Sequence, residues 1–88
     1  MALSKVTVVD KIEVLELGQV QVRTATRVLE DGVELSSSFH RHVVEPSTKA
    51  SGSWADTDIS GEDARVQAIA TATWTSAVKT AYQEMVDA

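Results

Sequence analysis

The sequence predicts an α+β fold, in which a three-stranded antiparallel β-meander is followed by two short C-terminal helices packed on one sheet face. Two observations lead to this prediction. Residues 5–45 alternate between apolar and polar side chains, as strands do when they bury one face, and Gly18 and Gly32 divide them into three runs. Residues 60–87 instead carry apolar side chains at intervals of three and four, as a helix does. We therefore expect a single domain of 88 residues, with residues 46–58 as a loop between its two parts.

The first turn surrounds Gly18 and suits a three-residue hairpin loop, with glycine in the left-handed conformation and a bulge after it. This loop sets the register of the first two strands. The expected pairs are Val14 with Val20, Ile12 with Val22, Val8 with Thr26 and Val6 with Val28. One face of the hairpin is then apolar along its whole length.

The second turn contains Asp31-Gly32, a pair typical of a two-residue type I′ loop. The expected pairs are Val28 with Leu35, Thr24 with Phe39 and Val20 with Val43. Both registers bury the same face, and this agreement supports the meander. The opposite face should be polar, with these side chains exposed on it: Gln19, Gln21, Arg23, Ala25, Arg27, Glu34, Ser36, Ser38, His40 and His42.

The helical part is expected to begin with Ser60 as the N-cap, with the carboxylates of Glu62 and Asp63 in the first turn. Thr75 and Ser76 can end this helix and cap a second one, although a single bent helix is the alternative. The two expected apolar faces consist of Val66, Ile69, Ala70, Thr73 and Trp74, and of Val78, Ala81, Tyr82, Met85 and Val86.

The core of so short a chain should be thin, because a domain of this size buries only roughly 60–65% of the surface of its unfolded chain. The chain has no cysteine, so neither disulfides nor thiolate-bound zinc can reinforce it. Association with other copies is a remaining source of stability. We therefore expect a homo-oligomer.

The charge of the chain excludes some partners. The net charge is −5 and the eight Lys and Arg residues are scattered, which argues against a general affinity for nucleic acid. No stretch approaches the ~20 apolar residues that span a bilayer, and the start of the chain lacks the apolar run of a signal peptide. We expect a protein that is cytosolic at synthesis and has no membrane partner.

Asp56, Asp58 and Ser60 match the first ligand positions of a calcium-binding EF-hand loop. The match then fails, because Gln67 occupies the position of the bidentate Glu and Asp63 occupies a position that is normally apolar. Gln offers one neutral oxygen where two carboxylate oxygens are needed. An acidic helix start explains these residues better than calcium does.

His40 and His42 alternate along the third strand, so both imidazoles should lie on the polar face, about 7 Å apart. Two ligands do not make a metal site. Three chains around a symmetry axis would supply six nitrogens, an octahedral set that iron or nickel accepts. That arrangement resembles the His-x-His iron sites at the tips of some trimeric phage spikes and fibres, but two solvated histidines are the simpler explanation.

No catalytic set or cofactor motif is evident. Glu34, Ser36, Ser38 and His40 share a strand face, but there is no nucleophile elbow and no glycine turn that could form an oxyanion hole. We therefore predict that the protein is not an enzyme and has no cofactor.

Aromatic residues are the best candidates for packing and for contact with partners. Trp74 and Tyr82 lie on the apolar helical faces and should be buried. Trp54 follows the loop and is the best candidate for a contact residue, together with Arg23, His40 and His42 on the polar sheet face.

The chain resembles a family of small uncharacterised proteins encoded by tailed bacteriophages and prophages, often near tail genes. The segments that carry the resemblance are Val22-Arg23-Thr24-Ala25-Thr26, Glu30-Asp31-Gly32, Phe39-His40-Arg41-His42-Val43, Ala64-Arg65-Val66-Gln67-Ala68-Ile69-Ala70 and Trp74-Thr75. They extend over nearly the whole chain and include no catalytic residue.

This resemblance implies a non-enzymatic structural or assembly module associated with the phage tail or fibre, located in the virion or in the host cytoplasm. Its partner would be a tail or fibre protein. The alternative is a small acidic inhibitor of a host nucleic-acid-binding or defence protein, which would need carboxylates gathered on one face, whereas the acidic residues here are spread along the chain.

Overall fold

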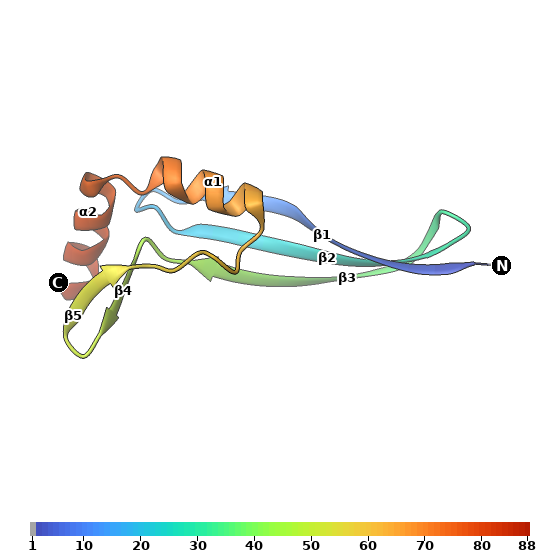
Figure 1. Cartoon of the computed structure of the whole chain (residues 1–88), viewed down its shortest axis with the longest axis horizontal. Coiled ribbons are helices and arrows are strands. Elements are labelled where there is room, and N and C mark those ends of the chain that lie inside the picture. Colours follow the sequence, from blue (N-terminus) through green and yellow to red (C-terminus); the bar gives the residue numbers. More distant parts are fainter. Residues whose placement is uncertain (1) are drawn as a thin grey trace.

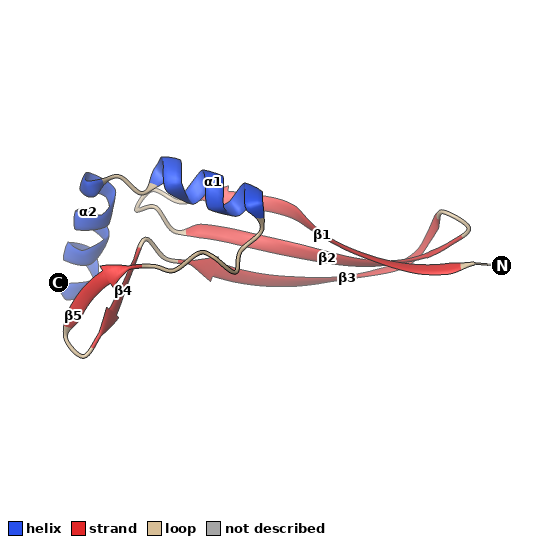
Figure 2. Ribbon diagram, in the orientation of Figure 1, coloured by secondary structure: helices blue, strands red, loops and turns tan. Residues whose placement is uncertain are grey.

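The computed structural model describes residues 2–88 and confirms the α+β fold (Figures 1 and 2). A three-stranded antiparallel sheet with the order β1-β2-β3 is followed by a two-stranded β4-β5 hairpin and then by two helices. The elements are β1 (Leu3–Val14), β2 (Val20–Glu30), β3 (Val33–Val44), β4 (Ser47–Ala50), β5 (Ser53–Asp56), α1 (Ala64–Thr73) and α2 (Ser76–Asp87).

The two helices pack on different parts of the molecule. Helix α1 lies along one face of the three-stranded sheet, whereas α2 lies at the end of the molecule against the β4-β5 hairpin (Figure 1). We call the sheet face that α1 covers the helix face and the opposite face the open face. A short α1 can cover only part of strands that are 11 or 12 residues long.

The remaining part of the sheet projects away from the helices (Figure 2). We call residues 3–8, 25–30 and 33–40 the arm. The chain measures 55 × 25 × 21 Å, and its radius of gyration of 16.7 Å exceeds the roughly 12 Å that is usual for 88 residues. Within residues 2–88, no helix or second sheet packs on either face of the arm (Figure 2).

The hydrophobic core lies between the helix face and α1, and the start of α2 packs against one end of it. Alternate residues of β2 bring Val20 and Val22 to this face, where they meet Val66 and Ala70 of α1. Trp74 closes the core at the end near Gly18, and Val44 completes the buried cluster. Val9, Ile12, Ile59 and Val78 are partly buried around it.

The first hairpin has the predicted register only near its turn. Val14 pairs with Val20 and Ile12 with Val22, as expected, and Gly18 has a positive φ of 88°. A bulge at Asp10 then shifts β1, so that Val8 pairs with Ala25 and Val6 with Arg27 instead of with Thr26 and Val28. The bulge brings Val9 to the helix face beside Ile12, and it moves Val6 and Val8 to the open face.

A bulge also changes the register of the second hairpin. The Asp31-Gly32 turn is confirmed, with positive φ at both residues and Glu30 opposite Val33. Leu35 is then an extra residue in β3. The predicted partners are wrong by one position: Val28 pairs with Ser36, Thr24 with His40 and Val20 with Val44.

This shift exchanges the faces of β3. A change of register by one residue moves every side chain of a strand to the other face. His40 and His42 therefore lie on the helix face, not on the polar face as predicted. Phe39, Arg41 and Val43 take their place on the open face, opposite Ala25, Arg23 and Gln21.

The segment predicted as a loop, residues 46–58, contains the β4-β5 hairpin. Its turn, Ser51-Gly52, has positive φ at both residues, as in the Asp31-Gly32 turn. β4 and β5 pair with each other, and the hairpin packs against helix α2. The Ser- and Thr-rich composition does not reveal these strands, because the contact with α2 is distant in sequence.

The helix boundaries are partly as expected. The N-cap of α1 is Asp63 and not Ser60, because the Asp63 carboxylate accepts a 2.9 Å hydrogen bond from the backbone N–H of Arg65. Glu62 thus precedes the helix. The break at Thr75 is confirmed: its hydroxyl accepts a hydrogen bond from the Val78 N–H and caps α2.

Candidate protein-interaction surface

The open face combines exposed apolar side chains with basic ones. Phe39 and Val43 are about half exposed, at 49% and 52%, and Val6 is 37% exposed. Four of the eight Lys and Arg residues of the chain lie on this face: Lys11, Arg23, Arg27 and Arg41. Exposed apolar side chains between arginines are typical of surfaces that contact other proteins.

Arg23 is the central side chain of this face. Its Nε and Nη2 atoms donate to the two carboxylate oxygens of Asp10 over 3.0 and 2.7 Å, and its guanidinium lies 4.4 Å from the centre of the Phe39 ring. The hydrogen bond from Arg23 lowers the pKa of Asp10. The bulge at Asp10 brings this carboxylate within reach of Arg23, so bulge and ion pair support each other.

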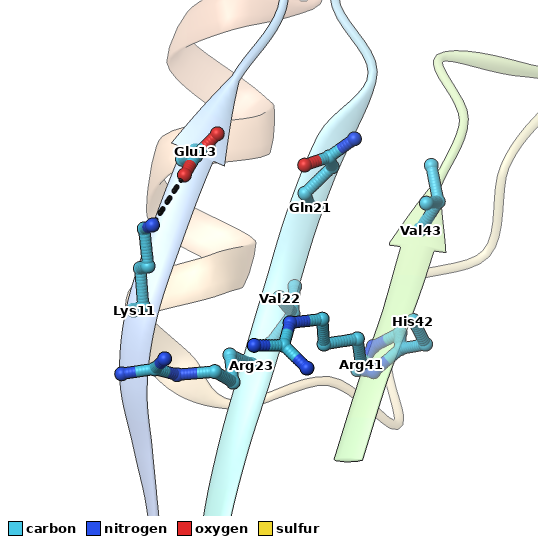
Figure 3. Close-up of a pocket in the computed structure, with 8 residues that line it drawn as sticks. All are labelled: Lys11, Glu13, Gln21, Val22, Arg23, Arg41, His42 and Val43. Atoms are coloured by element: carbon cyan, nitrogen blue, oxygen red, sulfur yellow. Dashed lines mark ion pairs between the residues drawn. The ribbon is translucent and has the colours of Figure 1, made fainter. Parts of the chain in front are cut away.

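A shallow depression of about 270 Å³ lies beside Arg23 (Figure 3). Lys11 and Glu13 of β1 form an ion pair of 2.7 Å at one side, and Arg41 extends from β3 across β2. The complete lining consists of Lys11, Glu13, Gln21, Val22, Arg23, Arg41, His42 and Val43. Arg41 has no ion pair within residues 2–88, so the depression offers one uncompensated positive charge.

The charge of the open face differs from that of the chain. Three acidic residues accompany the four basic ones: Asp10, Glu13 and Glu34. The difference, four minus three, leaves this face with a charge of +1, whereas the chain carries −5. A partner that is acidic and apolar would complement this face.

His40 and His42 lie together, with ring centroids 6.4 Å apart. His42 Nε2 lies 2.7 Å from a carboxylate oxygen of Glu62, so this histidine connects β3 to the segment before α1. Among the described residues, no three His, Asp or Glu side chains are grouped as metal ligands. The metal site in an oligomer would need ligands from other copies.

The carboxylates of the partial calcium loop bind other groups of the protein. Asp56 binds Lys79 of α2 over 2.9 Å. Asp58 accepts a 2.9 Å hydrogen bond from the backbone N–H of Ser60, which lowers the pKa of Asp58. The Asp56 carboxylate thus links β5 to α2, and the Asp58 carboxylate stabilises the connection between β5 and α1.

Trp54 makes contacts within the molecule. Its Nε1 donates to Asp87 over 3.0 Å, its ring meets Tyr82 edge to face at 6.1 Å, and Lys49 binds the same carboxylate over 2.7 Å. Trp54 thus attaches the β4-β5 hairpin to α2. Trp74 and Tyr82 are buried as predicted.

The packing of the β4-β5 hairpin on α2 around Tyr82 is expected to lose stability at alkaline pH. Burial, and after it the neighbouring Glu45 carboxylate, raise the pKa of Tyr82 to about 12. In the unfolded chain the Tyr82 hydroxyl ionises near pH 10. Burial of the neutral hydroxyl therefore contributes its full stabilisation below about pH 10, and this contribution is lost as the pH rises to about 12. We expect this group to lower the free energy of unfolding by roughly 2 kcal/mol between pH 9 and 12.

Urea unfolding at pH 9, 10, 11 and 12 measures this effect, with Tyr82→Phe as the control. Lysine deprotonation affects both proteins in the same way. The wild-type protein should therefore lose stability relative to the variant as the pH rises, and parallel curves would contradict the assignment.

Sequence reasoning missed Phe39, Arg41 and Asp10 as members of this surface. The alternation alone, without the bulges, places Phe39 opposite Thr24 on the buried face and His40 and His42 on the polar face. The single signal for a bulge was the Asp10-Lys11 pair, which interrupts the apolar alternation of β1 between Val9 and Ile12.

Scans against protein-family models, curated proteins and solved structures found no match to this chain. Over residues 2–88, neither helix has the length and apolar character needed to cross a membrane.

Proposed function

We propose that this protein is a non-enzymatic structural or assembly module that acts through protein contacts, and that its site of action is the phage tail or fibre apparatus that the sequence resemblance implies. The observation that supports it best is the arm, a β-sheet that projects beyond the helices with both faces uncovered. An isolated sheet of this kind gains stability when a partner covers it.

The exposed area is consistent with a missing partner. A monomer of 9.5 kDa usually exposes about 5,050 Å², whereas this chain exposes 5766 Å². The excess is roughly 700 Å², close to the ~800 Å² that each partner buries in a standard protein–protein interface. The chain therefore has surplus surface of the size that one interface requires.

The chemistry of the open face indicates what this partner offers. Phe39 and Val43 would be covered by apolar side chains, and Arg41 would be paired with a carboxylate. The acidic-inhibitor alternative needs a clustered acidic face, whereas the four basic and three acidic residues of the open face leave it with a charge of +1.

The bulge at Leu35 also weakens an enzymatic interpretation. Ser36, Ser38 and His40 share the helix face, but Glu34 pairs with Leu29 and lies on the open face. The acid is thus separated from the residues that a catalytic set would require.

Co-purification tests the proposal. The tagged protein is co-expressed with phage tail and fibre proteins, and Arg41→Glu is compared with Lys5→Glu, an equal charge change on the helix face of the arm. We expect one of these proteins to be retained, with at least tenfold weaker binding for Arg41→Glu and less than a twofold change for Lys5→Glu.

Equal retention of both variants would contradict the role of the open face. Retention of no tail or fibre protein would contradict the function, and capture of a basic host protein would favour the inhibitor.

A further inference from the structure

The two outer edges of the sheet differ in how they are protected. An exposed edge strand offers unpaired N–H and C=O groups to another strand, and proteins limit this with bulges and charges. On β1, the bulge at Asp10 interrupts the edge, and the Arg65 guanidinium of α1 donates to the Val9 carbonyl. Lys11 and Lys5 add charge along this strand. Edge β1 is therefore poorly suited to pairing.

Edge β3 lacks this protection over most of its length. Its register with β2 is regular from Ser36 to Val44, and residues 33–41 are all exposed. Within the described part of the chain, β3 forms backbone ladder hydrogen bonds with β2 alone. Figure 1 shows this outer edge running free along the arm.

We propose that β3 pairs in antiparallel fashion with β3 of a second copy, around a two-fold axis at Ser38, so that two sheets become one sheet of six strands. This inference rests on the proposed function, for which it names one partner and its mode of contact. A two-fold axis uses the same edge on both copies, and no second binding surface is needed.

Side-chain size supports the position of the axis. Ser36, Ser37 and Ser38 form the smallest run on β3, and with the axis at Ser38 the larger side chains next to the axis each lie opposite a serine of the second copy. In this register Ser36 lies opposite His40 of the second copy, and Ser37 lies opposite Phe39.

Charge supports the same register. Glu34 and Arg41 both lie on the open face. With the axis at Ser38, Arg41 lies opposite Leu35 of the second copy. Because Leu35 is the extra residue of the bulge, Glu34 is the next open-face side chain on that strand and the one beside Arg41, and the same contact occurs twice. Arg41 has no ion pair within the described monomer, and Glu34 makes a long one of 3.4 Å with Arg27. The edge is thus complementary to itself in charge.

Cysteine cross-linking tests the pairing, because the natural chain contains no cysteine. In Ser38→Cys, the two thiols would meet at the axis with Cα atoms roughly 4.5–5.5 Å apart, within the range of a disulfide. Ser4→Cys on edge β1 is the matched control, since it places an exposed thiol on the same arm. Circular dichroism first checks that both variants fold as the wild-type chain does.

We expect the wild-type chain to have the mass of a dimer in solution. Mild oxidation should convert most of Ser38→Cys to a covalent dimer, at least ten times faster than Ser4→Cys. A monomeric wild-type chain, or equal rates for the two variants, would overturn the pairing, and faster cross-linking of Ser4→Cys would assign the interface to β1. None of these results depends on the retention of a tail protein. The strand pairing can therefore be contradicted while the proposed function stands, and the proposed function can be contradicted while the strand pairing stands.

Discussion

Replacing Trp74 with alanine is expected to lower the free energy of unfolding by about 3–5 kcal/mol, the usual cost of deleting a large buried side chain. Trp74 is 9% exposed and belongs to the buried cluster of Val20, Val22 and Val66. Its Nε1 also donates to the Gly18 carbonyl over 2.6 Å, which joins the helical part to the first turn. Because 88 residues provide only about 4–13 kcal/mol of stability, a large share of the variant should be unfolded.

Urea unfolding followed by circular dichroism measures this loss, and Trp54→Ala is the matched control. Trp54 is only half-buried and lies outside the cluster, so its removal should cost less than about 2 kcal/mol. If Trp74→Ala does not fold, Trp74→Phe retains one ring and loses the hydrogen bond and part of the buried volume, for roughly 1–3 kcal/mol. Equal effects of Trp74→Ala and Trp54→Ala would contradict the location of the core.

Substituting Gly18 with alanine is expected to destabilise the fold by roughly 2–4 kcal/mol, for two reasons that add. Gly18 has φ +88°, a conformation that side chains rarely adopt. A Cβ atom there would also overlap the Cγ1 of Val78 and would lie 3.3 Å from Pro46 and 3.4 Å from Trp74. The turn would have to move away from both the core and α2.

Gly32→Ala separates these two effects. Gly32 has nearly the same φ, +84°, but an added Cβ would meet nothing within 4 Å. This control should cost only the backbone strain, about 1 kcal/mol. Thermal unfolding of both variants gives the difference, and equal losses would show that the close contact at Gly18 contributes nothing.

The sequence alone determined the features that depend on neighbouring residues. Gly18 and Asp31-Gly32 predicted two turns correctly, because positive φ is a local property of the backbone. Thr75 predicted the start of α2, because a cap involves a hydroxyl and an N–H three residues later. The apolar residues at helical spacing predicted the buried positions of Trp74 and Tyr82.

Tertiary structure decided which face of the sheet each side chain occupies. The bulges at Asp10 and Leu35 are set by partners on another strand, and each reverses the alternation beyond it. For this reason the candidate surface contains Phe39 and Arg41, while His40 and His42 lie on the helix face. Likewise, the β4-β5 hairpin depends on contacts with α2 that are distant in sequence. Local sequence patterns predict turns and helix caps, whereas strand register and the uncovered arm follow from contacts between segments far apart in the chain.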